Sequence, residues 1–71
     1  MNKDIIKQLE KRYEDKIDSL EKLQKTILKD INKTKPKQGK GILTNMLIEV
    51  DSYINIYCTE LRYLKELKEK E

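Results

Sequence analysis

Apolar residues recur every three or four positions along two long stretches of this chain, and one short break separates the stretches. The first stretch carries Ile6, Leu9, Tyr13, Ile17, Leu20, Leu23, Ile27 and Ile31 at this spacing. The second carries Leu43, Met46, Leu47, Val50, Tyr53, Ile54, Tyr57, Leu61, Leu64 and Leu67. Spacings of three and four are typical of an α-helix with one apolar face. The pattern therefore predicts helices over about 2–33 and about 42–70.

The break between the two stretches contains the only proline of the chain, Pro36, and both of its glycines, Gly39 and Gly41. A proline pushes the residue before it out of the α region, so the first helix cannot continue through this segment. We expect a turn at about 34–41. The whole chain, 1–71, is then a single all-α domain, a two-helix antiparallel hairpin.

The two predicted helices differ in the width of their apolar arcs. At about 100° per residue, the first arc covers roughly 140° and the second roughly 220°. One neighbouring helix cannot cover 220°, so the second helix needs a further partner. The residues that widen its arc, or lie beyond it, are Ile42, Ile48, Ile56, Cys58 and Tyr63. We expect these five to form a surface for self-association or for a partner. A second copy of the chain is the simplest occupant, and two hairpins would make a four-helix bundle.

Two alternatives qualify this interpretation. The extra apolar residues could be isolated exposed side chains, which need no partner. The segment 52–59 is also rich in residues that favour strands, among them Tyr53, Ile54, Ile56 and Tyr57. It lacks flanking turn signals, however, and the helical period runs through it. We therefore predict that this segment is helical.

Composition makes self-association more attractive. The chain has 71 residues, of which 41% are charged and 37% hydrophobic. A core of this size rarely contributes more than about 3–5 kcal/mol of net stability, and small domains usually gain more from disulfides, metals or association. One cysteine cannot form an internal disulfide, and the absence of histidine makes a structural zinc site unexpected. Association is the remaining route.

The same features bear on location and cofactors. A lone cysteine fits a reducing compartment, and the first residues lack the apolar core of a signal peptide. No stretch approaches the 18 apolar residues of a membrane span. We expect a soluble cytoplasmic protein that spans no membrane and uses no cofactor or metal. The excess of lysine over arginine and the many isoleucines suggest an AT-rich genome, such as that of a low-GC bacterium or its phage.

Positive charge is concentrated at the predicted turn. The net charge is +3, whereas residues 29–40 alone carry five lysines and Asp30, or +4. Four of these lysines, Lys33, Lys35, Lys37 and Lys40, are candidates for contacting an anion such as nucleic acid. The other interpretation is that they only keep the turn solvated. The segment 37–41 is not a phosphate-binding P-loop, because the glycine spacing is wrong and no hydroxyl follows the lysine.

The sequence offers little for catalysis. General acid–base chemistry most often uses histidine, which the chain lacks. Cys58 has no histidine to activate it, and most carboxylates fit a solvated surface. We do not expect an enzyme.

One charged residue interrupts each apolar stripe near its middle, Lys16 in the first and Glu60 in the second. If the chain reverses around 37–38, residue i faces approximately residue 75 minus i, which places Lys16 opposite 59–60. We predict that these two residues pair and set the register of the hairpin. Alternatively, each side chain reaches water separately.

These features favour a small non-catalytic helical protein that acts by protein–protein interaction, as a regulator or inhibitor encoded by a phage or mobile element. Its expected partners are a second copy and an unidentified protein target. The competing hypothesis is a nucleic-acid-binding helical dimer that uses the lysine-rich turn.

Overall fold

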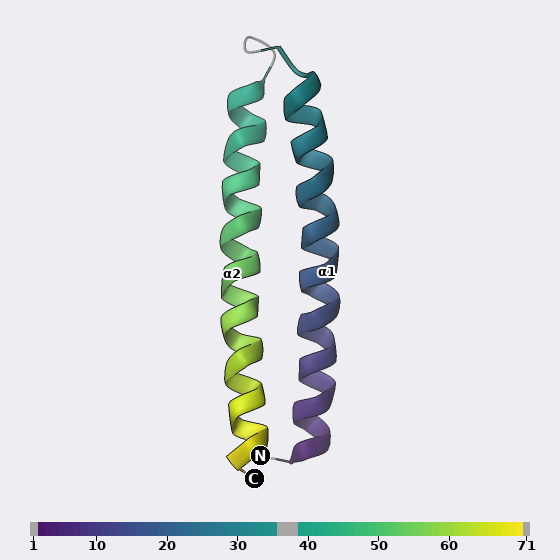
Figure 1. The fold of residues 1–71 in the computed structure, drawn as a ribbon, viewed down its shortest axis with the longest axis vertical. Coiled ribbons are helices and arrows are strands. Elements are labelled where there is room, and N and C mark those ends of the chain that lie inside the picture. The colour runs from purple at the N-terminus through teal and green to yellow at the C-terminus, as the bar shows by residue number, and fades with distance from the viewer. Residues whose placement is uncertain (1, 36–38, 71) are drawn as a thin grey trace.

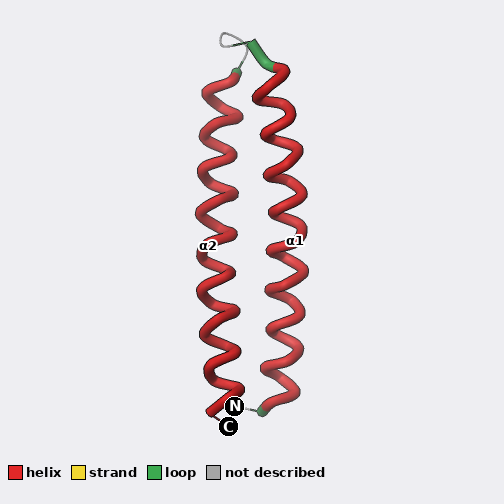
Figure 2. The backbone as a smooth tube through the Cα atoms, in the orientation of Figure 1, coloured by secondary structure: helices red, strands yellow, loops and turns green. Residues whose placement is uncertain are grey.

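Two long antiparallel helices make up the chain (Figures 1 and 2). The computed structural model describes residues 2–35 and 39–70. Helix α1 spans Lys3–Lys33 and helix α2 spans Lys40–Lys70, each 31 residues long. They lie side by side along a rod of 54 × 14 × 11 Å, with the start of α1 and the end of α2 at the same end. The predicted all-α helical hairpin is confirmed.

Helix α1 begins and ends with local hydrogen bonds that the sequence provides. The side chain of Asn2 accepts a hydrogen bond of 2.8 Å from the backbone N–H of Asp4, as an N-cap does. At the other end, the hydroxyl of Thr34 donates to the carbonyl of Asp30 at 2.6 Å. The backbone N–H of Thr34 donates to the carbonyl of Ile31 at 3.3 Å. These bonds satisfy backbone groups that a helix end leaves without partners.

Helix α2 begins two residues earlier than the sequence pattern suggested. Gly39 has a φ of +94°, which glycine adopts without the steric penalty of a side chain. The carbonyl of Gly39 then accepts the first helical hydrogen bond, from the N–H of Leu43 at 3.1 Å. The helix can therefore begin at Lys40, and Gly41 lies inside its first turn. Pro36 and Lys37 lie outside the described residues.

The segment 52–59 is helical, as predicted, despite its strand-favouring composition. Its hydroxyl groups bond to carbonyls one turn back. Ser52 donates to the carbonyl of Ile48 at 3.0 Å, and Thr59 donates to that of Asn55 at 2.9 Å. Their hydroxyls are thus satisfied within the helix rather than competing with it.

The helices meet along a seam, which we define as the inward positions that repeat at alternating spacings of four and three. In α1 the seam contains Ile6, Glu10, Tyr13, Ile17, Leu20, Gln24, Ile27 and Ile31, and in α2 it contains Leu43, Leu47, Val50, Ile54, Tyr57, Leu61, Leu64 and Lys68. Every one of these side chains is buried or half-buried. This alternation is the pattern of a coiled coil, in which each helix presents one narrow stripe to its neighbour.

Three contacts across the seam fix its register. The amide of Gln24 donates to the carboxylate of Asp51, and these residue numbers add up to 75, as predicted. Nearer the chain ends, the rings of Tyr13 and Tyr57 have centroids 5.7 Å apart. The ammonium of Lys68 lies 3.0 Å from a carboxylate oxygen of Glu10.

The resulting core is thin. The buried hydrophobic residues of the described chain are Ile6, Ile27, Val50 and Leu64, and of these Ile6 alone is fully buried. The radius of gyration is 16.2 Å, against about 11 Å for a compact domain of this length. A single seam between two helices leaves most side chains at the surface, so the function of the chain has to be sought on its exposed sides.

Candidate functional surface

Exposed hydrophobic side chains gather on one side of the hairpin. The described residues include nine large hydrophobic residues that are exposed. Seven of them occupy positions immediately before a seam residue: Ile5, Leu23, Ile42, Met46, Tyr53, Ile56 and Tyr63. We call the surface that these seven residues form the apolar face. It runs along the whole of α2 and is continued by fewer residues of α1.

The residues before the seam lie on the same side in both helices. Lys16 and Glu60 occupy such positions, one in each helix, and both interact with the side chain of Tyr13. This sharing follows from antiparallel packing, because two right-handed helices that run in opposite directions turn their corresponding flanks to the same side. The apolar face is therefore one continuous side of the molecule.

The opposite side of the hairpin carries the positions that follow the seam, and we call it the charged face. Its charged residues are Lys7, Lys11, Glu14, Asp18, Glu21, Lys25, Asp51, Arg62, Lys65 and Glu69. The exposed Leu28 and Ile48 lie on this face as isolated hydrophobic residues. The positions before the seam carry five charged residues, Arg12, Lys16, Asp30, Glu49 and Glu60, against the ten of the charged face, so the hairpin is amphipathic across its thickness.

The five residues predicted to form a partner surface are divided between the two faces. Ile42, Ile56 and Tyr63 lie on the apolar face, whereas Ile48 and the free thiol of Cys58 lie on the charged face. A 220° arc is wider than one side of a hairpin, so its two edges necessarily point in opposite directions. The structure thus brings together three of the five residues.

Four members of the apolar face were missed by the sequence reasoning. The sequence pattern places Met46 and Tyr53 in the main apolar stretch of the second helix and Leu23 in that of the first, and it does not distinguish Ile5. A signal was present: α2 carries a second alternation of three and four, offset by one residue from the seam. It runs through Ile42, Met46, Glu49, Tyr53, Ile56, Glu60, Tyr63 and Leu67.

A polar and aromatic cluster lies at the seam beside the apolar face. The ammonium of Lys16 lies 5.8 Å from the ring centroid of Tyr13 and 5.2 Å from that of Tyr57. Glu60 contacts the hydroxyl of Tyr13. The predicted pair therefore meets at a shared tyrosine, without a direct ion pair between the two charges. The reason is chemical: the aromatic ring attracts the cation, and the phenol offers the carboxylate a hydrogen-bond donor.

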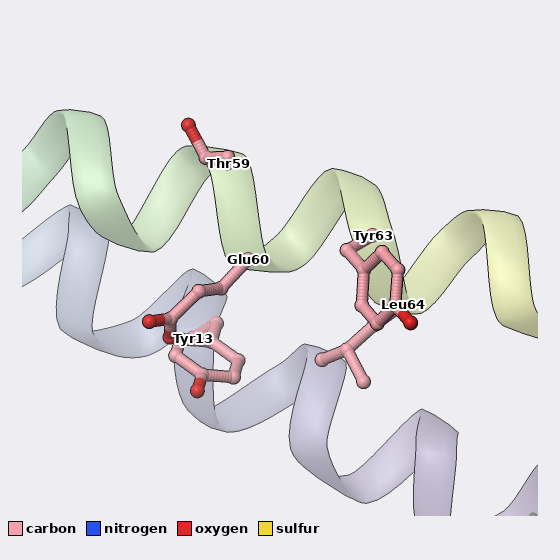
Figure 3. Close-up of a pocket in the computed structure, with 5 residues that line it drawn as sticks. All are labelled: Tyr13, Thr59, Glu60, Tyr63 and Leu64. Carbon is pink, nitrogen blue, oxygen red and sulfur yellow. The ribbon is translucent and has the colours of Figure 1, made fainter.

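Two shallow hollows flank this cluster. Figure 3 shows the first, of about 390 Å³, lined by Tyr13, Thr59, Glu60, Tyr63 and Leu64. In this view Glu60 points toward Tyr13, and Leu64 points toward α1. The second, of about 360 Å³, is lined by Asp15, Lys16, Ser19, Leu20 and Tyr57. Hollows with this mixture of aromatic and aliphatic walls suit apolar side chains of another polypeptide.

The contact between Tyr13 and Glu60 predicts a pH dependence of stability. The hydrogen bond to Glu60, then burial, then the negative charge of Glu60 raise the pKa of Tyr13 above its ordinary 10.0. The folded state therefore holds this proton more tightly than the unfolded state. The associated stability is complete below pH 10 and is lost as the pH rises through the folded-state pKa.

We expect Tyr13→Phe to lose less stability than the wild type between pH 8 and pH 11. Urea unfolding of both proteins at the two pH values measures this difference. The two proteins differ only in the hydroxyl of residue 13, so the comparison isolates its contribution. Equal losses in the two proteins would mean that Tyr13 and Glu60 do not interact in solution.

Lysine side chains gather at the closed end of the hairpin. Lys33 ends α1 and Lys40 begins α2, while the exposed Lys35 lies in the connection. We call these three, with Lys37, which lies outside the described residues, the lysine tip. The structure thus brings the described members of the predicted anion contact to one end of the rod.

Replacing all four lysines of the lysine tip with Gln should leave the thermal midpoint within a few degrees of the wild-type value. Lys33 and Lys35 are exposed and Lys40 is half-buried, and surface substitutions of this kind usually change stability by less than about 0.5 kcal/mol. Removing Lys33 takes a favourable charge from a helix C-terminus, and removing Lys40 takes an unfavourable one from an N-terminus, so these dipole effects oppose each other. Circular dichroism melting curves measure the outcome. A large fall would give the lysine tip a structural role.

Residues 2–35 and 39–70 bring no three His, Cys, Asp or Glu side chains together as a metal site would require. Neither α1 nor α2 has a stretch long and apolar enough to cross a membrane. Comparison with protein-family models, with curated proteins and with solved structures finds no match to this chain.

Proposed function

We propose that this chain is a small non-catalytic helical protein that acts by protein–protein interaction through the apolar face. The observation that carries this proposal is the placement of seven of the nine exposed large hydrophobic residues of the described chain on one side. Exposed apolar residues scattered singly need no explanation, but a contiguous patch of them usually marks an interaction site.

The form of the apolar face favours a polypeptide as the occupant. The rod is 54 Å long, and the hollows on this side are shallow rather than enclosed. Small ligands usually bind in deep cavities that enclose most of their surface. The apolar face includes Tyr53, Tyr63 and Met46. Tyrosine and methionine are enriched at the centres of protein interfaces. A helical partner could lie along this face and present residues at spacings of three and four.

A regulatory or inhibitory role fits such a molecule. The sequence contains no histidine and a single thiol, Cys58, on the charged face. A chain of this kind changes the behaviour of its partner by occupying a surface, and it needs no chemistry of its own. We propose that its activity consists of binding alone.

Capture experiments with two matched variants test this proposal. Ile56 and Ile48 lie on the same helix and are 49% and 59% exposed, but they point to opposite faces. Immobilised wild type and Ile48→Lys should retain the same proteins from a lysate of the source cells. Ile56→Lys should lose them, because a charge then interrupts the apolar face. Retention should persist at high salt. Identical retention by all three proteins would contradict the proposed role of the apolar face.

The second candidate function is nucleic-acid binding by the lysine tip. The observation that favours it is the concentration of +4 charge within residues 29–40, at one end of the rod. Binding through phosphates weakens steeply with salt, because the lysines release condensed counterions. If this function holds, nucleic acid should be retained at low salt and released at high salt. The fourfold Lys→Gln variant should then lose it, whereas Ile56→Lys should retain it.

A further inference from the structure

We propose that a second copy of this chain covers the apolar face, with α2 packed against α2 of the second copy and the two lysine tips at opposite ends. This inference rests on the proposed function, since it names the first occupant of the same face. Three features of the molecule support it: the exposed surface of the single hairpin, the polarity of the two helices on this side, and the charge at the lysine tip.

The exposed surface of one hairpin matches what a dimer needs. The chain exposes 5705 Å², whereas a compact protein of 8.5 kDa exposes about 4,700 Å². The excess of about 1,000 Å² is close to the roughly 800 Å² that each partner buries in a standard interface. Packing two hairpins through their apolar faces would therefore bring the surface of each chain into the ordinary range.

Two symmetric arrangements place one apolar face on the other. A twofold axis parallel to the helices puts both lysine tips at one end and lays α2 of one copy on α1 of the other. A twofold axis perpendicular to the helices puts the lysine tips at opposite ends and lays α2 on α2 and α1 on α1. The two arrangements bury the same face, but they pair different residues.

Polarity on the apolar face favours the arrangement with opposite tips. In the positions before the seam, α2 presents mainly hydrophobic residues, whereas α1 presents Arg12, Lys16 and Ser19 at its centre. With the tips together, the hydrophobic residues of α2 would lie on these polar groups, and Tyr63 would lie near Arg12. With opposite tips, most hydrophobic residues of α2 meet hydrophobic residues of the other α2, while Glu49 comes near Glu60 of the second copy, and the centres of the two α1 flanks meet each other. Burying charged groups against apolar ones is strongly unfavourable.

One feature favours the other arrangement, but it is already used within each hairpin. With the tips together, Glu60 of one copy would approach Lys16 of the other. Both residues already interact with Tyr13 of their own chain, so the second copy would add little to either. This possible contact does not outweigh the mismatch along the rest of α2.

Charge at the lysine tips favours the same arrangement. Residues 29–40 carry +4 in each copy. Stacked helices lie roughly 8–10 Å apart, so adjacent tips would repel at a separation similar to the Debye length of about 8 Å in physiological salt. Tips at opposite ends of a 54 Å rod are several Debye lengths apart, and their repulsion is fully screened.

Distance measurement between spin labels distinguishes the arrangements. Lys35 is exposed, lies beside the end of α1 and is outside the apolar face, so a label there leaves the interface intact. The protein is the full chain with Cys58→Ser and Lys35→Cys, which carries one label per copy. In the proposed dimer, pulsed electron paramagnetic resonance should give a distance of roughly 50 Å, close to the length of the rod. Light scattering should give about twice 8.5 kDa.

Two results would overturn the proposal. A distance below roughly 25 Å would show that the tips lie together, since stacked hairpins are separated by only about one helix diameter. A monomeric mass, with helicity retained, would show that no second copy binds. In either case the proposed function could still hold, because retention of other proteins through Ile56 is measured separately. Identical retention by wild type, Ile48→Lys and Ile56→Lys would contradict the proposed function, and it would leave the mass and the distance of the unsubstituted dimer as proposed.

Discussion

Replacing Ile27 with Ala is expected to remove about 2–4 kcal/mol of stability, the usual effect of truncating a buried Ile or Leu. Ile27 is only 3% exposed and is one of the four buried hydrophobic residues of the described chain. Because a chain of this size has little stability to spare, a loss of this magnitude should unfold most of the hairpin at 37 °C. Circular dichroism at 222 nm and urea unfolding measure the effect.

The adjacent residue provides the matched control. Leu28 is 44% exposed on the charged face, next to Ile27 in sequence but outside the seam. Leu28→Ala removes apolar atoms from a helix of the same sequence context, and alanine is at least as good a helix former. It should change stability by less than about 0.5 kcal/mol. Equal effects of the two substitutions would show that the seam does not run through Ile27.

Replacing Lys68 with Leu is expected to destabilise the hairpin by about 1–3 kcal/mol, because the buried carboxylate of Glu10 then loses its partner. The carboxylate of Glu10 lies in the seam with a side chain only 10% exposed, and Lys68 lies 3.0 Å from it. That oxygen is buried and has no hydrogen bond of good geometry, so the ammonium is its main partner. Without Lys68, the negative charge stays in the seam uncompensated.

The double substitution Glu10→Leu with Lys68→Leu should return the free energy of unfolding to the wild-type value or raise it above that value. Buried ion pairs often stabilise a protein no more than hydrophobic residues of similar volume, while removing one partner alone is costly. Urea unfolding of the wild type, both single variants and the double variant gives the coupling free energy. Additive effects would mean that Glu10 and Lys68 do not interact across the seam.

The spacing of hydrophobic residues was enough to predict the architecture. Two helices, the break near Pro36 and Gly39 and the antiparallel register all follow from positions that repeat at three and four. The predicted register, which pairs Gln24 with Asp51, required only the point at which the chain reverses. These features depend on local helix geometry, which the sequence specifies directly.

The composition of the seam could not be predicted in the same way. A hydrophobic stripe suggested Leu9 and Leu23 as inward residues, but the seam contains Glu10 and Gln24. Each lies within one residue of a hydrophobic alternative, and a rotation of one position about the helix axis decides between them. Cross-helix partners favour the polar choices here, since Lys68 and Asp51 are available to them.

The candidate surface was partly predictable for a related reason. The wide apolar arc of α2 correctly indicated more hydrophobic surface than one helix can cover. The side on which a residue at either edge of this arc lies depends on which residues form the seam. A shift of the seam by one residue moves such a residue from one side of the hairpin to the other. For this reason Ile56 and Ile48 were grouped on the basis of sequence, although they lie on opposite faces.

Sedimentation equilibrium of Ile56→Lys and Ile48→Lys, beside the wild type, tests most directly the central claim that the apolar face is an association surface. The wild type and Ile48→Lys should both give about twice 8.5 kDa at micromolar concentration. Ile56→Lys should give 8.5 kDa, or require at least a tenfold higher concentration to associate. Equal association by both variants, or weaker association by Ile48→Lys than by Ile56→Lys, would contradict the claim.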